Sequence, residues 1–181
     1  MTRKRAQLLI VVGAVGLLIL GVIAVLSPDR GRFAPDSRLA AAPCAPSTPE
    51  GTVVHVTLSD GGVMMGTSTP MMVSLNASPD SVHAGVVTFI ATNVGELTHE
   101  LLILPAPRGV VGTRSVDATG KIDESSSLGE ASRSCGQGTG PGISPGTSSW
   151  VTLHLSRGGY ELLCDVAWHY ASGMFSPFVV R

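Results

Sequence analysis

The chain has 181 residues, enough for one domain with an additional segment, and its formal net charge is −1. The charge is uneven, because a basic triplet (Arg3, Lys4, Arg5) comes first, whereas residues 27–181 carry nine basic and thirteen acidic side chains. This composition lacks the basic surface by which proteins bind nucleic acid, so we expect no nucleic-acid partner.

Residues 1–26 predict a membrane anchor. Residues 6–26 contain no charged side chain, and a helix rising about 1.5 Å per residue over this length crosses a hydrocarbon layer of about 30 Å. A cleavable signal peptide usually has a shorter apolar core followed by small residues, whereas Ser27 and Pro28 follow here. The basic triplet is expected to stay in the cytoplasm. We therefore expect a single-pass protein of the cell membrane, with its C-terminal domain on the extracytoplasmic side.

Residues 27–51 are rich in Pro and Ala and show no apolar periodicity, which is typical of a flexible linker. This segment contains Cys44, and a second cysteine outside the candidate site is Cys135. In an oxidising compartment the two could form a disulfide; the alternative is a pair of free thiols.

Residues 52–181 are expected to form an all-β domain. Val54, Val56 and Leu58 alternate with polar residues, as in a strand with one buried face. Glycine and proline punctuate the segment, and no helical periodicity of useful length appears in it, so we predict an antiparallel β-sandwich. Further strands are expected at residues 71–75, 86–92, 99–103, 150–155 and 160–164.

Residues 105–147 interrupt this pattern with a long insert rich in Gly and Ser. So long a connection is either functional or locally structured. We expect a short helix around residues 123–131. Residues 117–124 resemble a calcium loop in composition but lack the full EF-hand spacing, so an ordinary loop is the favoured interpretation.

The segment from Cys164 to Met174 carries the candidate chemistry. Four residues separate Cys164 from His169, and four more separate His169 from Met174. A thiolate, an imidazole and a thioether suit copper, and a blue copper site adds a second imidazole, for which His99 after Asn93-Val-Gly95 is well placed. We predict one mononuclear type 1 copper ion, with His99, Cys164 and His169 equatorial and Met174 axial. Zinc also accepts Cys and His, but the thioether favours copper.

These motifs resemble those of the cupredoxin family, and the two equal four-residue spacers resemble its sulfocyanin and rusticyanin branch. The resemblance covers roughly residues 82–104 and 150–181. It implies a Greek-key sandwich and outer-sphere transfer of single electrons between redox partner proteins, such as a respiratory-chain donor and acceptor, rather than an enzyme. The matching residues are Gly85-Val-Val-Thr-Phe89, Asn93-Val-Gly95, His99, Gly159-Tyr-Glu-Leu-Leu-Cys164, His169 and Gly173-Met174.

Two residues depart from the pattern of the resembled family. Glu100 stands where plastocyanins and azurins usually carry an asparagine that braces the cysteine loop, so that bracing is not implied here. Trp168 precedes the second histidine, where glycine is common, and the edge of that histidine is expected to face solvent. An apolar patch that we predict as the docking surface for a partner consists of Trp168, Ala171, Phe175 and Pro177.

Two other copper functions compete with electron transfer on the same residues. A multicopper oxidase would need further histidines beside the cysteine, but Leu163 and Asp165 flank Cys164. A copper-handling protein, a chaperone or sequestering module, is the stronger alternative, because thioethers bind Cu(I). The methionines available for this outside the loop are Met64, Met65, Met71 and Met72, for which core packing is the plainer interpretation.

Overall fold

The structure is a computed structural model that describes residues 44–61 and 72–181. The predicted anchor, most of the predicted linker and Met64, Met65 and Met71 lie outside these residues. Within the described part of the chain, no helix has the length and apolar character needed to cross a membrane. The strands are β1 (Thr52–Asp60), β2 (Val73–Ser78), β3 (Ser81–Val82), β4 (Gly85–Asn93), β5 (Leu101–Pro105), β6 (Gly129–Ala131), β7 (Gly136–Gln137), β8 (Ser148–Leu155), β9 (Gly158–Leu163) and β10 (Phe175–Val180).

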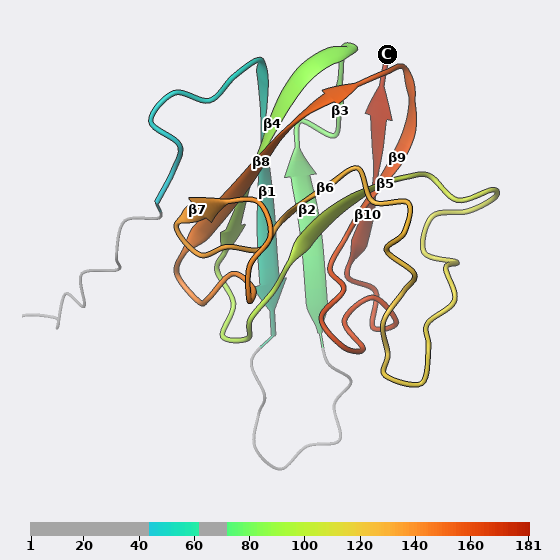
Figure 1. The fold of residues 1–181 in the computed structure, drawn as a ribbon. Helices are drawn as coiled ribbons and strands as arrows, with labels where there is room; N and C mark the ends of the chain where they lie inside the picture. Colours follow the sequence, from blue (N-terminus) through green and yellow to red (C-terminus); the bar gives the residue numbers. More distant parts are fainter. Residues whose placement is uncertain (1–43, 62–71) are drawn as a thin grey trace, which may run out of the picture. The chain divides into compact units, whose positions relative to one another are not determined.

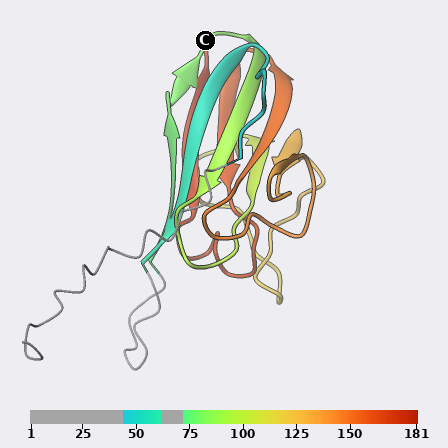
Figure 2. The ribbon, with the colours of Figure 1, turned by 90° about the vertical axis from the view of Figure 1, so that its left-hand side faces the viewer.

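Two five-stranded sheets make up this domain, and their inner faces share one core (Figures 1 and 2). The first sheet has the order β2-β1-β4-β8-β7 and the second the order β3-β10-β9-β5-β6. The chain changes sheet repeatedly along its length, as a Greek-key sandwich requires. The predicted all-β sandwich is therefore confirmed for the described residues.

The pairing of strands differs from the expected antiparallel arrangement in three places. β1 pairs with β4, β7 with β8 and β3 with β10 in parallel. Parallel neighbours need a crossover, and between β1 and β4 the chain passes through β2 and β3 before it returns to the first sheet. Reading alternation along single strands does not reveal such crossovers.

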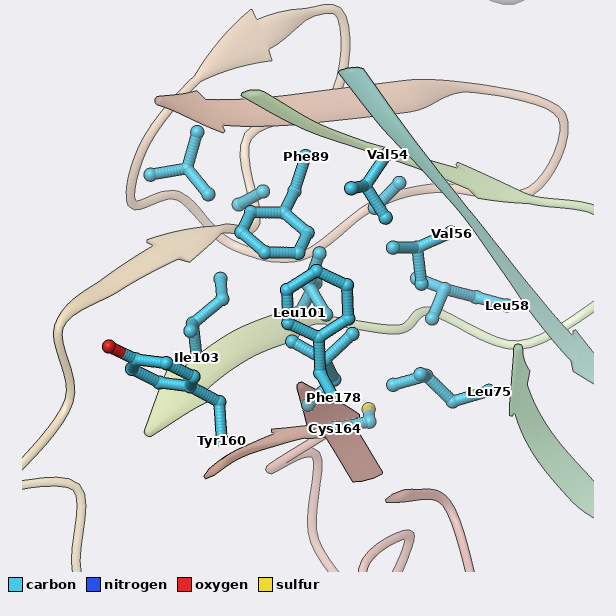
Figure 3. Close-up of a cluster of buried hydrophobic side chains, with 14 of the residues drawn as sticks. Val54, Val56, Leu58, Leu75, Phe89, Leu101, Ile103, Tyr160, Cys164 and Phe178 are labelled. Carbon is cyan, nitrogen blue, oxygen red and sulfur yellow. The ribbon is translucent and has the colours of Figure 1, made fainter. Parts of the chain in front are cut away.

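The shared core explains why the alternating residues face inward. Val54, Val56 and Leu58 of β1 are buried, and so are Phe89 of β4 and Phe178 of β10, whose rings meet edge to face at 5.2 Å. Burial of apolar surface stabilises such a core by roughly 25 cal/mol per Å². Figure 3 shows Cys164 at one edge of this cluster, so its thiol lies where the core meets the loop that follows β9.

The insert has a structural role that the sequence left open. Leu101 to Leu104 of β5 are all buried, although successive strand residues point to opposite faces. Leu102, Leu104 and Leu163 form a second cluster with Ile122 of the insert and with Tyr170. The insert therefore covers the outer face of the second sheet and contributes β6 and β7 to the two sheets.

The short helix expected at residues 123–131 is absent, and this prediction is wrong. The Asp123 side chain accepts a hydrogen bond from the Ser125 amide at 2.9 Å, and Gly129–Ala131 forms β6 beside β5. A short polar side chain that bonds to nearby backbone competes with a helix. In the neighbouring loop, Asp117 accepts hydrogen bonds from the Thr119 and Lys121 amides, as in an ordinary turn.

A disulfide joins Cys44 to Cys135, with their Cα atoms 5.0 Å apart. Residues 44–51 contain no strand, but the Glu50 carbonyl accepts a hydrogen bond from the Thr88 hydroxyl at 2.7 Å. The disulfide therefore ties the end of the predicted linker to the insert, 91 residues later in the sequence.

Candidate metal centre

Three of the four predicted ligands converge at one end of the sandwich. The Nδ1 atoms of His99 and His169 lie 3.2 Å apart, and the Cys164 Sγ lies 4.0 Å and 3.5 Å from them. All three residues are buried, with exposures of 0%, 0% and 3% for His99, Cys164 and His169. The loop that carries two of them lies at the end of the domain opposite Arg181, the C-terminus in Figure 1.

The backbone of His99 is fixed by the insert and by the loop that precedes it. It forms an isolated bridge with Ile143 of the insert, in which the Ile143 amide donates to the His99 carbonyl at 2.7 Å. The Asn93 side chain supports the preceding loop, because its amide donates to the Leu97 and Ile143 carbonyls at 2.7 Å and 2.8 Å. The Gly95 amide donates to the Asn93 side-chain oxygen and so closes the turn. The Asn-x-Gly motif therefore fixes the backbone that leads to His99.

The ring of His99 makes a second polar contact with Asp60 at the end of β1. Asp60 Oδ2 lies 2.9 Å from His99 Nε2, and the two side chains are 3% and 0% exposed. Burial opposes ionisation of Asp60, but hydrogen bonds from the Leu97 amide, His99 and the Glu96 amide together hold its pKa below the usual value. The acid is therefore an acceptor, and His99 donates to it.

Cys164 follows directly after β9 and faces the core. Burial raises the pKa of its thiol to about 12, although a hydrogen bond from the Glu100 amide to Sγ, 3.3 Å long, acts against this. A metal ion must therefore displace the thiol proton. Glu100, the residue after His99, therefore contacts the sulfur through its backbone.

His169 and Met174 belong to one closed loop. The Met174 amide donates to the His169 carbonyl at 3.1 Å, and the Cys164 amide donates to the Met174 carbonyl at 3.1 Å. Met174 is 0% exposed and lies in the same apolar cluster as Cys164. Burial and the neighbouring His99 lower the pKa of His169 to about 4, so this ligand is neutral at physiological pH.

The predicted docking patch is only partly exposed. Trp168 is 52% exposed and has a positive φ of 70°, while its amide donates to the Gly120 carbonyl of the insert at 2.9 Å. Ala171 and Pro177 are exposed, but Phe175 packs against Tyr170 with ring centroids 5.3 Å apart. His169, expected to show its edge to solvent, is almost fully covered.

A buried ion pair fastens the loop to the insert. Glu161 of β9 is 0% exposed and pairs with the Arg114 guanidinium, and its carboxylate also accepts bonds from the Gly112 amide and the Tyr170 hydroxyl. A buried carboxylate needs such partners to offset its desolvation. Tyr170 follows His169 directly, so the network holds the backbone beside a candidate ligand.

The donor atoms fit a single type 1 copper ion. With bond lengths near 2.0 Å for nitrogen and 2.3 Å for sulfur, as in zinc sites, two ligands of one ion lie at most about 4.3 Å apart. The three measured separations of 3.2, 3.5 and 4.0 Å fall inside this limit. Two imidazoles and a thiolate are also the equatorial set of blue copper sites. No other cluster of this kind is found within residues 44–61 and 72–181.

Sequence reasoning missed Asp60. The signal was available, because Val54, Val56 and Leu58 occupy alternate positions and Asp60 is the next member of the series. A carboxylate on the buried face of a strand calls for a partner. The partner lies 39 residues later in the sequence, so the pairing itself was not visible.

No protein-family model and no curated protein sequence matches the chain. Among solved structures it is similar to reduced rusticyanin, with 22% identity, 73% of this chain and 81% of that chain covered, and a TM-score of 0.43. It is also similar to dithionite-reduced auracyanin from Roseiflexus castenholzii (18% identity, 74% and 99% covered, TM-score 0.44). A third is auracyanin A, a "blue" copper protein from Chloroflexus aurantiacus (16% identity, 71% and 99% covered, TM-score 0.43).

Proposed function

We propose that this protein carries single electrons by means of one type 1 copper ion held by His99, Cys164, His169 and Met174. The observation that carries the proposal is the convergence of two imidazole nitrogens and one thiol sulfur, all within 4.8 Å of one another, at the edge of the core. Bound copper would supply the Cu(I)/Cu(II) couple. The protein's part is to hold the donor atoms and to keep water away from them.

Electron transfer suits this site better than catalysis. A catalytic metal site keeps a position open for water or substrate, whereas these ligands are almost fully buried. The strands on either side of the ligands belong to the packed core, and interiors packed at this density resist rearrangement. A ligand set that moves little between two oxidation states is what rapid one-electron exchange requires.

The cellular setting is part of the same proposal. Residues 1–26 would anchor the protein in the cell membrane, with the copper domain on the extracytoplasmic side, where an oxidising environment supports the Cys44–Cys135 disulfide. The partners would be redox proteins that dock beside His169, with half-exposed Trp168 at the centre of the contact.

Absorption and EPR spectra of the purified full-length chain in detergent, loaded with Cu(II), test the proposal. We expect one copper ion per chain, a strong blue absorption in the oxidised form and its reversible loss on reduction. A chain that binds copper but stays colourless when oxidised would exclude a blue copper carrier. Two or more Cu(I) ions per chain without reversible redox would favour copper handling instead.

A further inference from the structure

Asp60 is a buried acid in direct contact with a proposed copper ligand. Its Oδ2 lies 2.9 Å from Nε2 of His99, and its side chain is 3% exposed. The other ring nitrogen of His99, Nδ1, faces Cys164 and His169. A single imidazole ring therefore separates the Asp60 carboxylate from the group of donor atoms.

The contacts of Asp60 determine where the His99 proton lies. Besides His99, the Glu96 and Leu97 amides point at the same oxygen, at 2.9 Å and 3.0 Å. Both amides can only donate, so Oδ2 is an acceptor, and His99 completes the set as a donor through Nε2–H. Nδ1 of His99 is then left with a free lone pair, as a metal ligand requires.

The local sequence is built around this carboxylate. A Cβ atom on Gly95 would lie 1.9 Å from Asp60 Oδ2, so only glycine leaves room for the acid. Asn93 closes the turn that presents the Glu96 and Leu97 amides, with its Oδ1 2.9 Å from the Gly95 amide. The end of β1 and the loop from Asn93 to Leu97 therefore hold a carboxylate beside His99, at the ring nitrogen that faces away from Cys164 and His169.

We propose that Asp60 is a positioning residue that sets the His99 tautomer and lowers the reduction potential of the copper site. This inference rests on the proposed function. The oxidised ion carries one more positive charge than the reduced ion, so a buried negative charge one ring away stabilises it more. A carboxylate that accepts from a ligand imidazole also raises the basicity of that ligand.

The reduction potentials of two variants and one control test the effect of Asp60 on the Cu(I)/Cu(II) couple. Asp60→Asn should shift the potential upward by at least about 59 mV, which is a tenfold loss of preference for Cu(II) in a one-electron couple. Glu96→Gln is the matched control, since it removes one charge from an exposed side chain of the same loop and keeps the backbone donor. Its potential should stay near that of the wild type.

Gly95→Ala is the second variant, because it displaces the carboxylate without changing the net charge. It should raise the potential in the same direction as Asp60→Asn. If Asp60→Asn and Glu96→Gln give equal potentials in blue, folded proteins, the proposal is overturned.

Nitrogen NMR of the metal-free chain tests the tautomer independently of copper. We expect His99 to carry its proton on Nε2 in the wild type and in Glu96→Gln, and to show a mixture of tautomers in Gly95→Ala, which displaces the acceptor oxygen. A wild-type protein with the proton on Nδ1 would refute the role of Asp60 even in a blue protein. A colourless copper-loaded protein with the Nε2–H tautomer would instead refute the proposed function.

Discussion

The two histidines of the candidate site are held in different ways. His99 uses both ring nitrogens, one toward the donor cluster and one toward Asp60, and its backbone is bridged to Ile143. His169 sits on a loop of tight turns, and no described residue forms a hydrogen bond with its second ring nitrogen. Its neighbour Trp168 is half exposed.

This difference assigns different tasks to the two sides of the site. The His99 side is fixed from β1 and the insert, so it should set the stability and potential of the centre. The His169 side lies next to exposed aromatic surface, so it should set how fast electrons enter and leave. The following changes separate the two sides, beginning with one that disables both.

Cys164→Ser should abolish the blue absorption and most of the copper binding. The Cys164 sulfur lies beside both histidine nitrogens and is the soft ligand that copper prefers. A serine hydroxyl is a hard ligand and cannot replace it. Titration with Cu(II), followed by absorption, measures the loss. The control is the double variant Cys44→Ser with Cys135→Ser, which should be less stable by about 4–5 kcal/mol yet remain blue. A blue Cys164→Ser protein would rule out the assignment.

Asn93→Ala should weaken the His99 side and destabilise the fold by about 3 kcal/mol. The change removes the amide that donates to the Leu97 and Ile143 carbonyls and the oxygen that accepts from the Gly95 amide. Chemical denaturation of the metal-free protein measures the free energy of unfolding. Asn76→Ala is the control, because Asn76 is exposed on β2 and its loss should cost under about 0.5 kcal/mol. Equal effects would mean that the Asn93 turn is not the support described here.

Copper affinity should rise about tenfold per pH unit between pH 7 and pH 9. Burial raises the pKa of Cys164 to about 12, so over this range the metal-free thiol keeps its proton and must release it on binding. Burial lowers the pKa of His169 to about 4, so that residue is already neutral and adds no dependence. Competition with a chelator of known pH behaviour measures the slope. An affinity that does not change with pH would show that copper binding does not release the Cys164 thiol proton.

Trp168→Ala should slow transfer to a redox partner several-fold and leave the blue absorption nearly unchanged. Trp168 is 52% exposed beside His169, whereas Val94, 61% exposed, lies on the His99 side. Val94→Ala is therefore the matched control and should transfer at the wild-type rate. Stopped-flow mixing with the partner measures both rates. An unchanged rate in Trp168→Ala would remove the docking role from this surface.

The candidate ligands could be named from sequence because most of their spacing is local. Cys164, His169 and Met174 lie on one loop, and the alternation of Tyr160, Leu162 and Cys164 indicated that the thiol faces the core, as observed. His99 could be named because the Asn-x-Gly turn precedes it. Alternation also located β1, β8 and β9 to within a few residues.

The supports of the site were not predictable, because they join distant segments. Asp60 meets His99 across 39 residues, and Glu161 meets Arg114 across 47. The insert showed no apolar periodicity, yet Ile122 covers the second sheet. Its expected helix failed because polar side chains such as Asp123 bond to their own backbone, a local competition that composition does not resolve.

Copper-edge X-ray absorption of the loaded full-length chain tests the central claim most directly, because it counts the atoms bound to the metal. The convergence of His99, Cys164 and His169 predicts two nitrogen ligands and one short sulfur ligand on a single ion. The sulfur signal should vanish in Cys164→Ser. A copper ion surrounded by nitrogen and oxygen alone, or one whose environment is unchanged in that variant, would contradict the account.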